Sequence, residues 1–222
     1  MARSQPEGFL ATPSHEPARG VLVLHAWWGL NDTIKAVCKR LAEAGYTAFA
    51  PDLYHGKVAD TIPGAEALSQ VVDANHEQTE AEVVEAARFL HERAGGRGMT
   101  VMGFSLGAYY SIVLAAMHPD LIDSVALFYG TVGTMPVDQS RSQASYLGHF
   151  AANDPFETPA NVDTLESSLK QAGRPVSFYR YPGTSHWFFE PDRTDAYNKA
   201  AASLAWERTL EFLKSTSGKA AG

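Results

Sequence analysis

The sequence is poor in cysteine and in basic residues. Of its 222 residues only Cys38 is a cysteine, so neither an intramolecular disulfide nor a cysteine-based zinc cluster is possible. With 18 Lys and Arg against 25 Asp and Glu, the net charge of −7 leaves no basic patch for nucleic acid or for an anionic membrane surface. We therefore expect a neutral or weakly charged small molecule as the partner, and a monomer or small homo-oligomer.

Long apolar stretches are also missing. No segment approaches the roughly 20 apolar residues that a membrane-spanning helix needs, and residues 1–20 contain no apolar run of signal-peptide length. A cytoplasmic location is the resulting expectation. The composition, 45% hydrophobic and 19% charged, is that of a chain long enough for one sizeable core.

The most informative stretch is GFSLG at residues 103–107. It has the form G-x-S-x-G, the nucleophile elbow, in which a strand turns sharply into a helix and exposes a serine hydroxyl above the sheet. The flanks agree, because 99–104 is a short, mostly apolar run and 106–117 is long enough for a helix. The two glycines would let strand and helix approach closely. This context favours an elbow over a glycine-flanked turn without catalytic meaning.

Strands and helices alternate along the rest of the chain. The expected strands cover 9–13, 21–26, 47–50, 99–104, 124–129, 145–151 and 176–181. The expected helices are one that begins at a cap, Asp32 or Thr33, and ends at Gly45, and others over 76–94, 106–117, 159–171 and 194–214. This alternation predicts one doubly wound α/β domain over 1–222, with a mostly parallel sheet and a frayed tail at 215–222. Segments 53–75 and 131–144 have no readable pattern, which leaves open whether either covers a pocket.

A serine nucleophile needs a base, and the base needs a third group that holds its tautomer. In α/β-hydrolases these follow in the chain order serine, acid, histidine, each after a strand. Asp154 comes after the next-to-last expected strand, and His186 comes after the last. Because a proline follows it, Asp154 is also a candidate turn residue, with Glu157 as the nearest substitute acid. The order favours Ser105, Asp154 and His186 as a catalytic triad.

Acyl transfer also requires hydrogen-bond donors for the oxyanion. These are usually the backbone N–H after the nucleophile and one from the loop after an early strand, here Leu106 and Trp27. Aromatic residues flank the same loops, which predicts an apolar pocket. The pocket candidates are Trp28, Tyr54, Tyr109, Phe156 and Trp187. For the tryptophans a core position is the alternative.

Two other chemistries fit the sequence less well. Cys38 shares a helical face with Ile34, Val37 and Leu41, so a buried structural thiol is a better interpretation than a nucleophile. No two histidines have zinc-protease spacing and no acidic cluster accompanies one, so we predict no metal and no cofactor.

Five stretches together resemble the dienelactone hydrolase family, over nearly the whole chain and in family order. They are VLVLHAWWGLND, RLAEAGYTAFAPDLYHG, VMGFSLGAYY, HFAANDPF and YPGTSHWF. The resemblance implies a compact α/β-hydrolase fold without a separate lid domain, in which Ser105, Asp154 and His186 occupy the triad positions. It also places the oxyanion donors at Trp27 and Leu106.

Three positions depart from the best-known members of that family. Those members have a cysteine where this chain has Ser105, and a glutamate tied to control of the thiol at the position of Ala26, which lies beside His25. They hold the carboxylate of their dienelactone substrate with arginines, one of them four residues after the histidine, where this chain has Glu190. These departures favour hydrolysis of a small, uncharged ester or lactone over hydrolysis of dienelactone itself.

The sequence thus predicts a serine hydrolase that works through an acyl-enzyme at Ser105. One alternative is a thioesterase or acyltransferase on the same triad, which relative turnover of ester and thioester, with and without an alcohol acceptor, would distinguish. Another is a non-catalytic sensor whose pocket binds a ligand. Labelling of Ser105 by a fluorophosphonate probe would nearly exclude the sensor.

Overall fold

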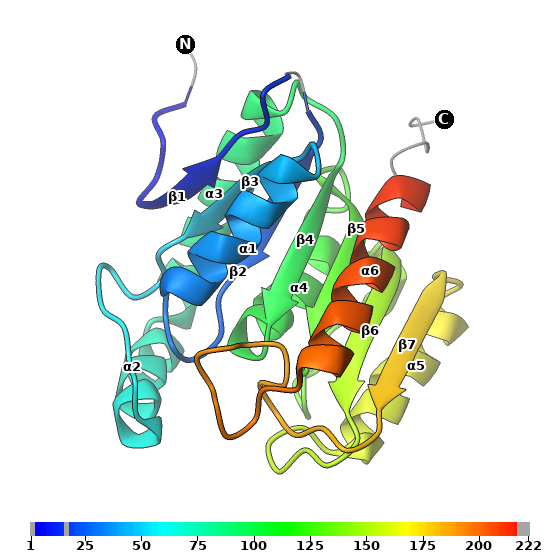
Figure 1. The fold of residues 1–222 in the computed structure, drawn as a ribbon. Coiled ribbons are helices and arrows are strands. Elements are labelled where there is room, and N and C mark those ends of the chain that lie inside the picture. The colour runs from blue at the N-terminus through cyan, green and yellow to red at the C-terminus, as the bar shows by residue number, and fades with distance from the viewer. Residues whose placement is uncertain (1–2, 16–17, 217–222) are drawn as a thin grey trace.

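The computed structural model describes residues 3–15 and 18–216 and contains a seven-stranded sheet with the order β1-β3-β2-β4-β5-β6-β7 (Figure 1). The strands are β1 (Gly8–Ala11), β2 (Gly20–Leu24), β3 (Thr47–Pro51), β4 (Met99–Phe104), β5 (Ile122–Phe128), β6 (Ser145–Ala151) and β7 (Val176–Tyr181). β1 pairs with β3 in the antiparallel sense, and the other neighbouring strands are parallel. The expected edge strand and the mostly parallel sheet are both confirmed.

Helices cover both faces of this sheet. They are α1 (Asp32–Glu43), α2 (Ile62–Ala74), α3 (His76–Arg93), α4 (Leu106–Met117), α5 (Pro159–Gln171) and α6 (Lys199–Thr216). α1 and α6 lie on one face, and α3, α4 and α5 lie on the other (Figure 1). The central strands are therefore buried on both sides, which produces two hydrophobic clusters, one on each face. Across 3–15 and 18–216, none of the helices has the length and apolar character needed to cross a membrane.

The start of α1 differs from the sequence expectation. Asn31, not Asp32 or Thr33, is the cap, because its extended backbone lets the side-chain oxygen accept the N–H of Ile34 at 3.1 Å. Thr33 instead donates its hydroxyl to Asp192 at 2.6 Å. Asn and Asp are equally good caps, so the sequence alone did not separate these neighbours.

The closing helix also has different bounds. α6 begins at Lys199 rather than Thr194, because Asn198 donates its N–H back to Phe188 at 2.9 Å and its side chain accepts the N–H of Ala201 at 3.1 Å. At the other end Ser215 and Thr216 continue the helix, so the expectation of a frayed tail is wrong for these two residues. Residues 217–222 lie outside the described residues.

The two segments without a readable pattern fold differently from each other. Residues 53–75 contain α2, which buries only Ala65, Ser69 and Val72 and therefore shows little apolar periodicity. Residues 131–144 are irregular apart from one short 3₁₀ turn. Among the described residues there is no separate lid domain.

The parallel arrangement brings the carboxyl ends of β2 to β7 to one edge of the sheet (Figure 1). Ligands of open α/β sheets bind along such an edge. The segments after β2, β4, β6 and β7 carry Trp27, Ser105, Asp154 and His186 respectively. Chain segments far apart in sequence therefore converge on one site.

Candidate active site

Ser105 forms the turn between β4 and α4. Its φ of 49° lies in the left-handed region, a strained conformation for a residue other than glycine. Its N–H donates to the carbonyl of Phe128 at 2.9 Å, which ties the turn to β5. Glycine is required on both sides, because a Cβ on Gly103 would lie 2.3 Å from the oxygen of Gly107, and one on Gly107 would lie 2.2 Å from that of Leu24. The elbow expected from the pentapeptide is present.

Ser105, His186 and Asp154 lie in one hydrogen-bonded row. The Oγ of Ser105 is 2.9 Å from Nε2 of His186, and Nδ1 of His186 is 2.7 Å and 2.9 Å from the two carboxylate oxygens of Asp154. The imidazole and the carboxylate are nearly buried, with 4% and 3% of their side chains exposed. The structure therefore brings together the three residues that the chain order selected, and their catalytic roles stay a prediction.

The carboxylate of Asp154 is held in place by the backbone of its own loop. Its Oδ1 accepts the N–H groups of Phe156 and Glu157, both at 2.9 Å. Asp154 is thus a turn residue as well as the partner of His186. The substitute acid, Glu157, is engaged elsewhere, because its Oε2 accepts the N–H of Thr131 at 2.7 Å.

The two backbone N–H groups predicted to bind the oxyanion belong to Leu106 and Trp27. Leu106 is the first residue of α4, where an N–H has no intrahelical acceptor. Trp27 is the second residue of a turn that Gly29 closes by donating its N–H to the carbonyl of Ala26 at 3.1 Å. Among the residues that the structure describes, neither the N–H of Trp27 nor that of Leu106 donates a hydrogen bond. Both are free to bind an anionic oxygen, and this role stays a prediction.

Aromatic rings surround His186. The Phe156 ring lies 5.1 Å from the imidazole, 4.9 Å from the Trp187 ring and 5.7 Å from the Trp27 ring, measured between centroids. Phe156 is 44% exposed, so it forms the outer edge of the site. Of the five pocket candidates, Phe156 and Trp187 lie directly against the hydrogen-bonded row. They give the site an apolar rim.

Trp28 occupies a core position, the alternative raised for the tryptophans. Only 2% of it is exposed. Its ring packs edge-on against Trp187 at 4.9 Å, and the guanidinium of Arg193 lies 4.0 Å from its centroid. Trp28 therefore supports Trp187 from behind.

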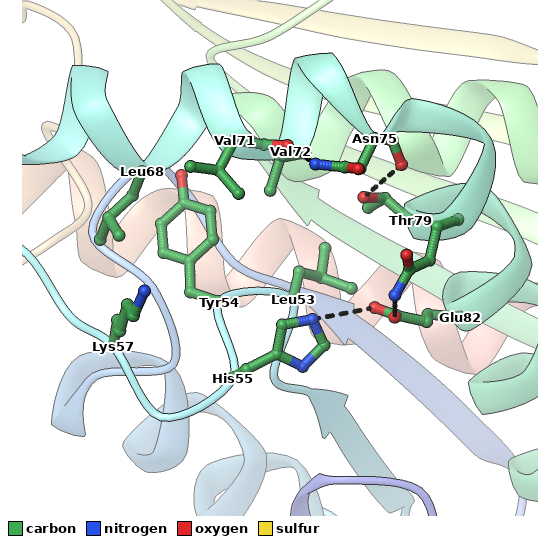
Figure 2. A pocket seen from close by; sticks show the side chains of 11 residues that line it. Leu53, Tyr54, His55, Lys57, Leu68, Val71, Val72, Asn75, Thr79 and Glu82 are labelled. Atoms are coloured by element: carbon green, nitrogen blue, oxygen red, sulfur yellow. Dashed lines mark hydrogen bonds and ion pairs between the residues drawn. The ribbon is translucent and has the colours of Figure 1, made fainter.

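Tyr54 and Tyr109 lie elsewhere. Tyr54 lines a separate cavity of about 230 Å³ between the segment after β3 and helices α2 and α3. Figure 2 shows its ring facing Leu68 and Val71 of α2. Tyr109, in the first turn of α4, packs against Tyr110 at 5.1 Å. The structure does not bring either tyrosine into contact with the hydrogen-bonded row.

A buried pair that was not predicted from the sequence, Tyr129 and Glu190, lies beside His186. The hydroxyl of Tyr129 donates to Oε1 of Glu190 at 2.7 Å, and the Tyr129 ring lies 5.0 Å from that of His186. Both residues are fully buried. Burial raises the pKa of Glu190 to about 8, so its carboxyl keeps its proton at neutral pH. The available signal was that Tyr129 follows β5 and so lies at the same edge of the sheet as Ser105.

The buried carboxyl of Glu190 should make stability depend on pH. Its pKa is about 8 in the folded protein against an ordinary 4.5, so the folded chain holds a proton that the unfolded chain has released. Stability from this group is complete below about pH 4.5 and falls as the pH rises towards 8, by as much as about 1.4 kcal/mol per unit. Urea unfolding of wild type and Glu190→Gln from pH 5 to 9 should show Glu190→Gln gaining on wild type as pH rises. The exposed Glu43→Gln is the control, and a constant difference between wild type and Glu190→Gln would contradict the prediction.

The structure also bears on two other chemistries, a cysteine nucleophile and a metal site. Burial in α1 raises the pKa of Cys38 to about 12, so its thiol stays protonated at neutral pH and is a poor nucleophile. Within the described part of the chain, no group of three or more His, Cys, Asp or Glu side chains is arranged to hold a metal ion.

Comparisons with known proteins agree with this architecture. Protein usf of Aquifex pyrophilus is 32% identical over 213 residues, which cover 93% of this chain and 92% of the relative. A protein of Saccharolobus solfataricus, provisionally named a carboxymethylenebutenolidase, is 31% identical over 246 residues, covering 94% and 93%. Both relatives match nearly their whole length.

The solved structures support the fold. The crystal structure of a dienelactone hydrolase-like promiscuous phosphotriesterase from metagenomic libraries has a TM-score of 0.80 at 21% identity, covering 93% of this chain and 88% of that one. At this identity the likeness shows a shared α/β-hydrolase fold. A model of the dienelactone hydrolase family matches residues 7–217. The chain therefore belongs to the dienelactone hydrolase family.

Proposed function

We propose that this chain is a serine hydrolase that cleaves a small, uncharged carboxylic ester or lactone through an acyl-enzyme. The observation that carries the proposal is the hydrogen-bonded row of three side chains. Oγ of Ser105 lies 2.9 Å from Nε2 of His186, and Nδ1 of His186 lies 2.7 Å and 2.9 Å from the carboxylate oxygens of Asp154. These are the distances at which a base takes a hydroxyl proton and an acid orients the base. The backbone donors on Asp154 support it, because they hold the acid in the orientation that the imidazole needs.

The proposed reaction has two proton-transfer stages. His186 Nε2 takes the proton of Ser105 as Oγ attacks the acyl carbonyl, while Nδ1–H stays bonded to Asp154 and stabilises the imidazolium. The carbonyl oxygen, now negative, accepts the N–H groups of Trp27 and Leu106. The imidazolium then protonates the leaving alkoxide. In the second stage His186 takes a proton from a water molecule as the water oxygen attacks the acyl carbonyl. The imidazolium then returns that proton to Oγ of Ser105 as the bond between Oγ and the acyl carbon breaks, which releases the carboxylic acid and free Ser105.

The preference for an uncharged substrate rests on two residues near the site, neither of which is placed to bind a substrate carboxylate. Glu190 stands where the best-known members have a substrate-binding arginine, and it is buried against Tyr129. Arg193 is directed elsewhere, because it stacks on Trp28 at 4.0 Å and pairs with Asp192 at 3.0 Å. The aromatic rim favours an apolar acyl group. A cytoplasmic location remains the prediction from the lack of long apolar stretches in the sequence.

A serine-directed fluorophosphonate probe tests the proposal. Intact mass spectrometry should show one adduct per chain, and peptide mapping should place it on Ser105, since only an activated hydroxyl reacts quickly. Cys38→Ala should be labelled as fast as wild type. A series of p-nitrophenyl esters from acetate to octanoate, run alongside, should give a chain-length optimum that sizes the site. Absence of labelling together with absence of turnover on every ester would favour a ligand-binding protein instead.

A further inference from the structure

The imidazole of His25 is fully buried just after β2, and both its nitrogens are hydrogen bonded. Nδ1 lies 2.7 Å from the carbonyl oxygen of Ala26, and because a carbonyl only accepts, Nδ1 carries the proton. Nε2 lies 3.3 Å from the nitrogen of Leu53 and accepts its N–H. Burial lowers the pKa of His25, which favours this neutral tautomer. No step of the proposed reaction uses this histidine.

The hydrogen bond from His25 determines where the next N–H points. A trans peptide group is planar, so its C=O and N–H point in opposite directions. The carbonyl of Ala26 accepts two donors, Nδ1–H of His25 and the N–H of Gly29 at 3.1 Å. The peptide group between Ala26 and Trp27 is therefore held from its carbonyl side, and the N–H of Trp27 points away from the imidazole.

This peptide group lies beside the elbow. The parallel register pairs Leu24 of β2 with Gly103 of β4, so the residues that follow Leu24 run alongside Ser105. A Cβ on Gly107 would lie 2.2 Å from the carbonyl oxygen of Leu24 and 2.8 Å from that of His25. The loop that His25 orders thus begins in contact with the helix that follows the nucleophile.

The segment after β3 holds the same loop from the other side. Besides the Leu53 N–H, the ring of Tyr54 meets the imidazole at 4.9 Å and 65°, an edge contact. Ala59 donates its N–H to the carbonyl of Trp28 at 3.1 Å. Two neighbouring strand ends are therefore joined through one histidine.

We propose that His25 is a positioning residue that aims the Trp27 N–H at the oxyanion. This inference rests on the proposed hydrolase function. His25 does not touch the substrate. It acts through the hydrogen bond that its Nδ1–H donates to the Ala26 carbonyl.

Two variants of nearly equal shape separate this role from packing. His25→Asn can still present an N–H donor at the δ position to the Ala26 carbonyl, whereas His25→Leu places a methyl group there. His25→Leu should lose roughly 10- to 100-fold in kcat on p-nitrophenyl esters with KM within about twofold, since losing one oxyanion donor costs about 10² to 10³. His25→Asn should recover most of that loss. Inhibition by a boronic acid, which forms a tetrahedral adduct on serine, should weaken in step with kcat.

A purely structural role predicts that His25→Leu keeps a higher kcat than His25→Asn, because a buried apolar site tolerates leucine better than asparagine. Equal kcat in both variants and wild type, or a kcat that follows only the melting temperature, would overturn the inference. Nitrogen NMR of wild type with ¹⁵N-histidine provides a test without substitution, and a protonated Nε2 on His25 would also overturn it. If wild type itself neither turns over esters nor takes the probe on Ser105, the proposed function fails. The His25 inference fails alone when wild type is active and the variants are unchanged.

Discussion

Replacing Ser105 with alanine is expected to lower kcat/KM for p-nitrophenyl acetate by at least about 10³-fold, with the fold unchanged. The hydroxyl that Nε2 of His186 accepts at 2.9 Å is the group that would form the acyl-enzyme, and alanine has no atom to replace it. The residue is only partly buried, and alanine is smaller than serine, so the elbow needs no rearrangement. Steady-state kinetics with each variant, at matched circular dichroism, measures the loss.

The control for this experiment is Ser203→Ala, an exposed serine on α6. This variant also loses a serine hydroxyl, but at a position far along the chain from Ser105, and it should retain full activity. Cys38→Ala should also be fully active, because the buried thiol takes no part in the proposed reaction. Retention of more than a tenth of the wild-type kcat/KM by Ser105→Ala would mean that another group is the nucleophile.

Replacing Gly107 with alanine is expected to destabilise the fold by about 3 kcal/mol or more, at or beyond the upper end for overpacked sites. The added Cβ would lie 2.2 Å from the oxygen and 2.6 Å from the carbon of the Leu24 carbonyl, both backbone atoms of β2. Backbone inside a parallel sheet has little room to move. Alanine is the better helix former by about 1 kcal/mol, and this gain is too small to offset the clash. Urea unfolding followed by tryptophan fluorescence measures the difference.

Gly64→Ala is the matched control, because Gly64 is also helical and its new Cβ would meet only the Thr61 hydroxyl at 3.1 Å and the Ala59 Cβ at 3.7 Å. It should be neutral or slightly stabilising. If Gly107→Ala is as stable as Gly64→Ala, then α4 is not packed against β2 as closely as the structure shows.

The residues that follow the ends of the strands were the part of the site that the sequence predicted. A short apolar run followed by a glycine-bounded serine indicates the elbow, and the acid and histidine follow later strands in the order that the fold imposes. The sequence could not separate Asp154 as a turn residue from Asp154 as the partner of His186. The structure shows both, because one carboxylate oxygen accepts two loop N–H groups while both oxygens meet the imidazole.

The pocket candidates flank the loops of the site in sequence, but nearness in sequence did not predict which side chains lie against His186. Phe156 and Trp187 reach His186, whereas Trp28 turns into the core and Tyr54 faces α2 across a different cavity. Adjacent residues such as Trp27 and Trp28 point to different places because the turn closed by Gly29 rotates one away from the other. No periodicity in the sequence predicts that rotation.

The sequence by itself determined the fold class and selected Ser105, Asp154 and His186, the three residues that the structure joins by hydrogen bonds, because the alternation of strands and helices and the order of the motifs are properties of the chain. Only the tertiary structure decided the left-handed backbone of Ser105, the buried Tyr129–Glu190 pair and the tautomer of His25. Each of these depends on contacts between segments that are distant along the chain, such as Leu53 with His25 or Gly107 with Leu24. Burial then sets the protonation of Glu190 and His25, and burial is a property of the packed molecule rather than of any local pattern.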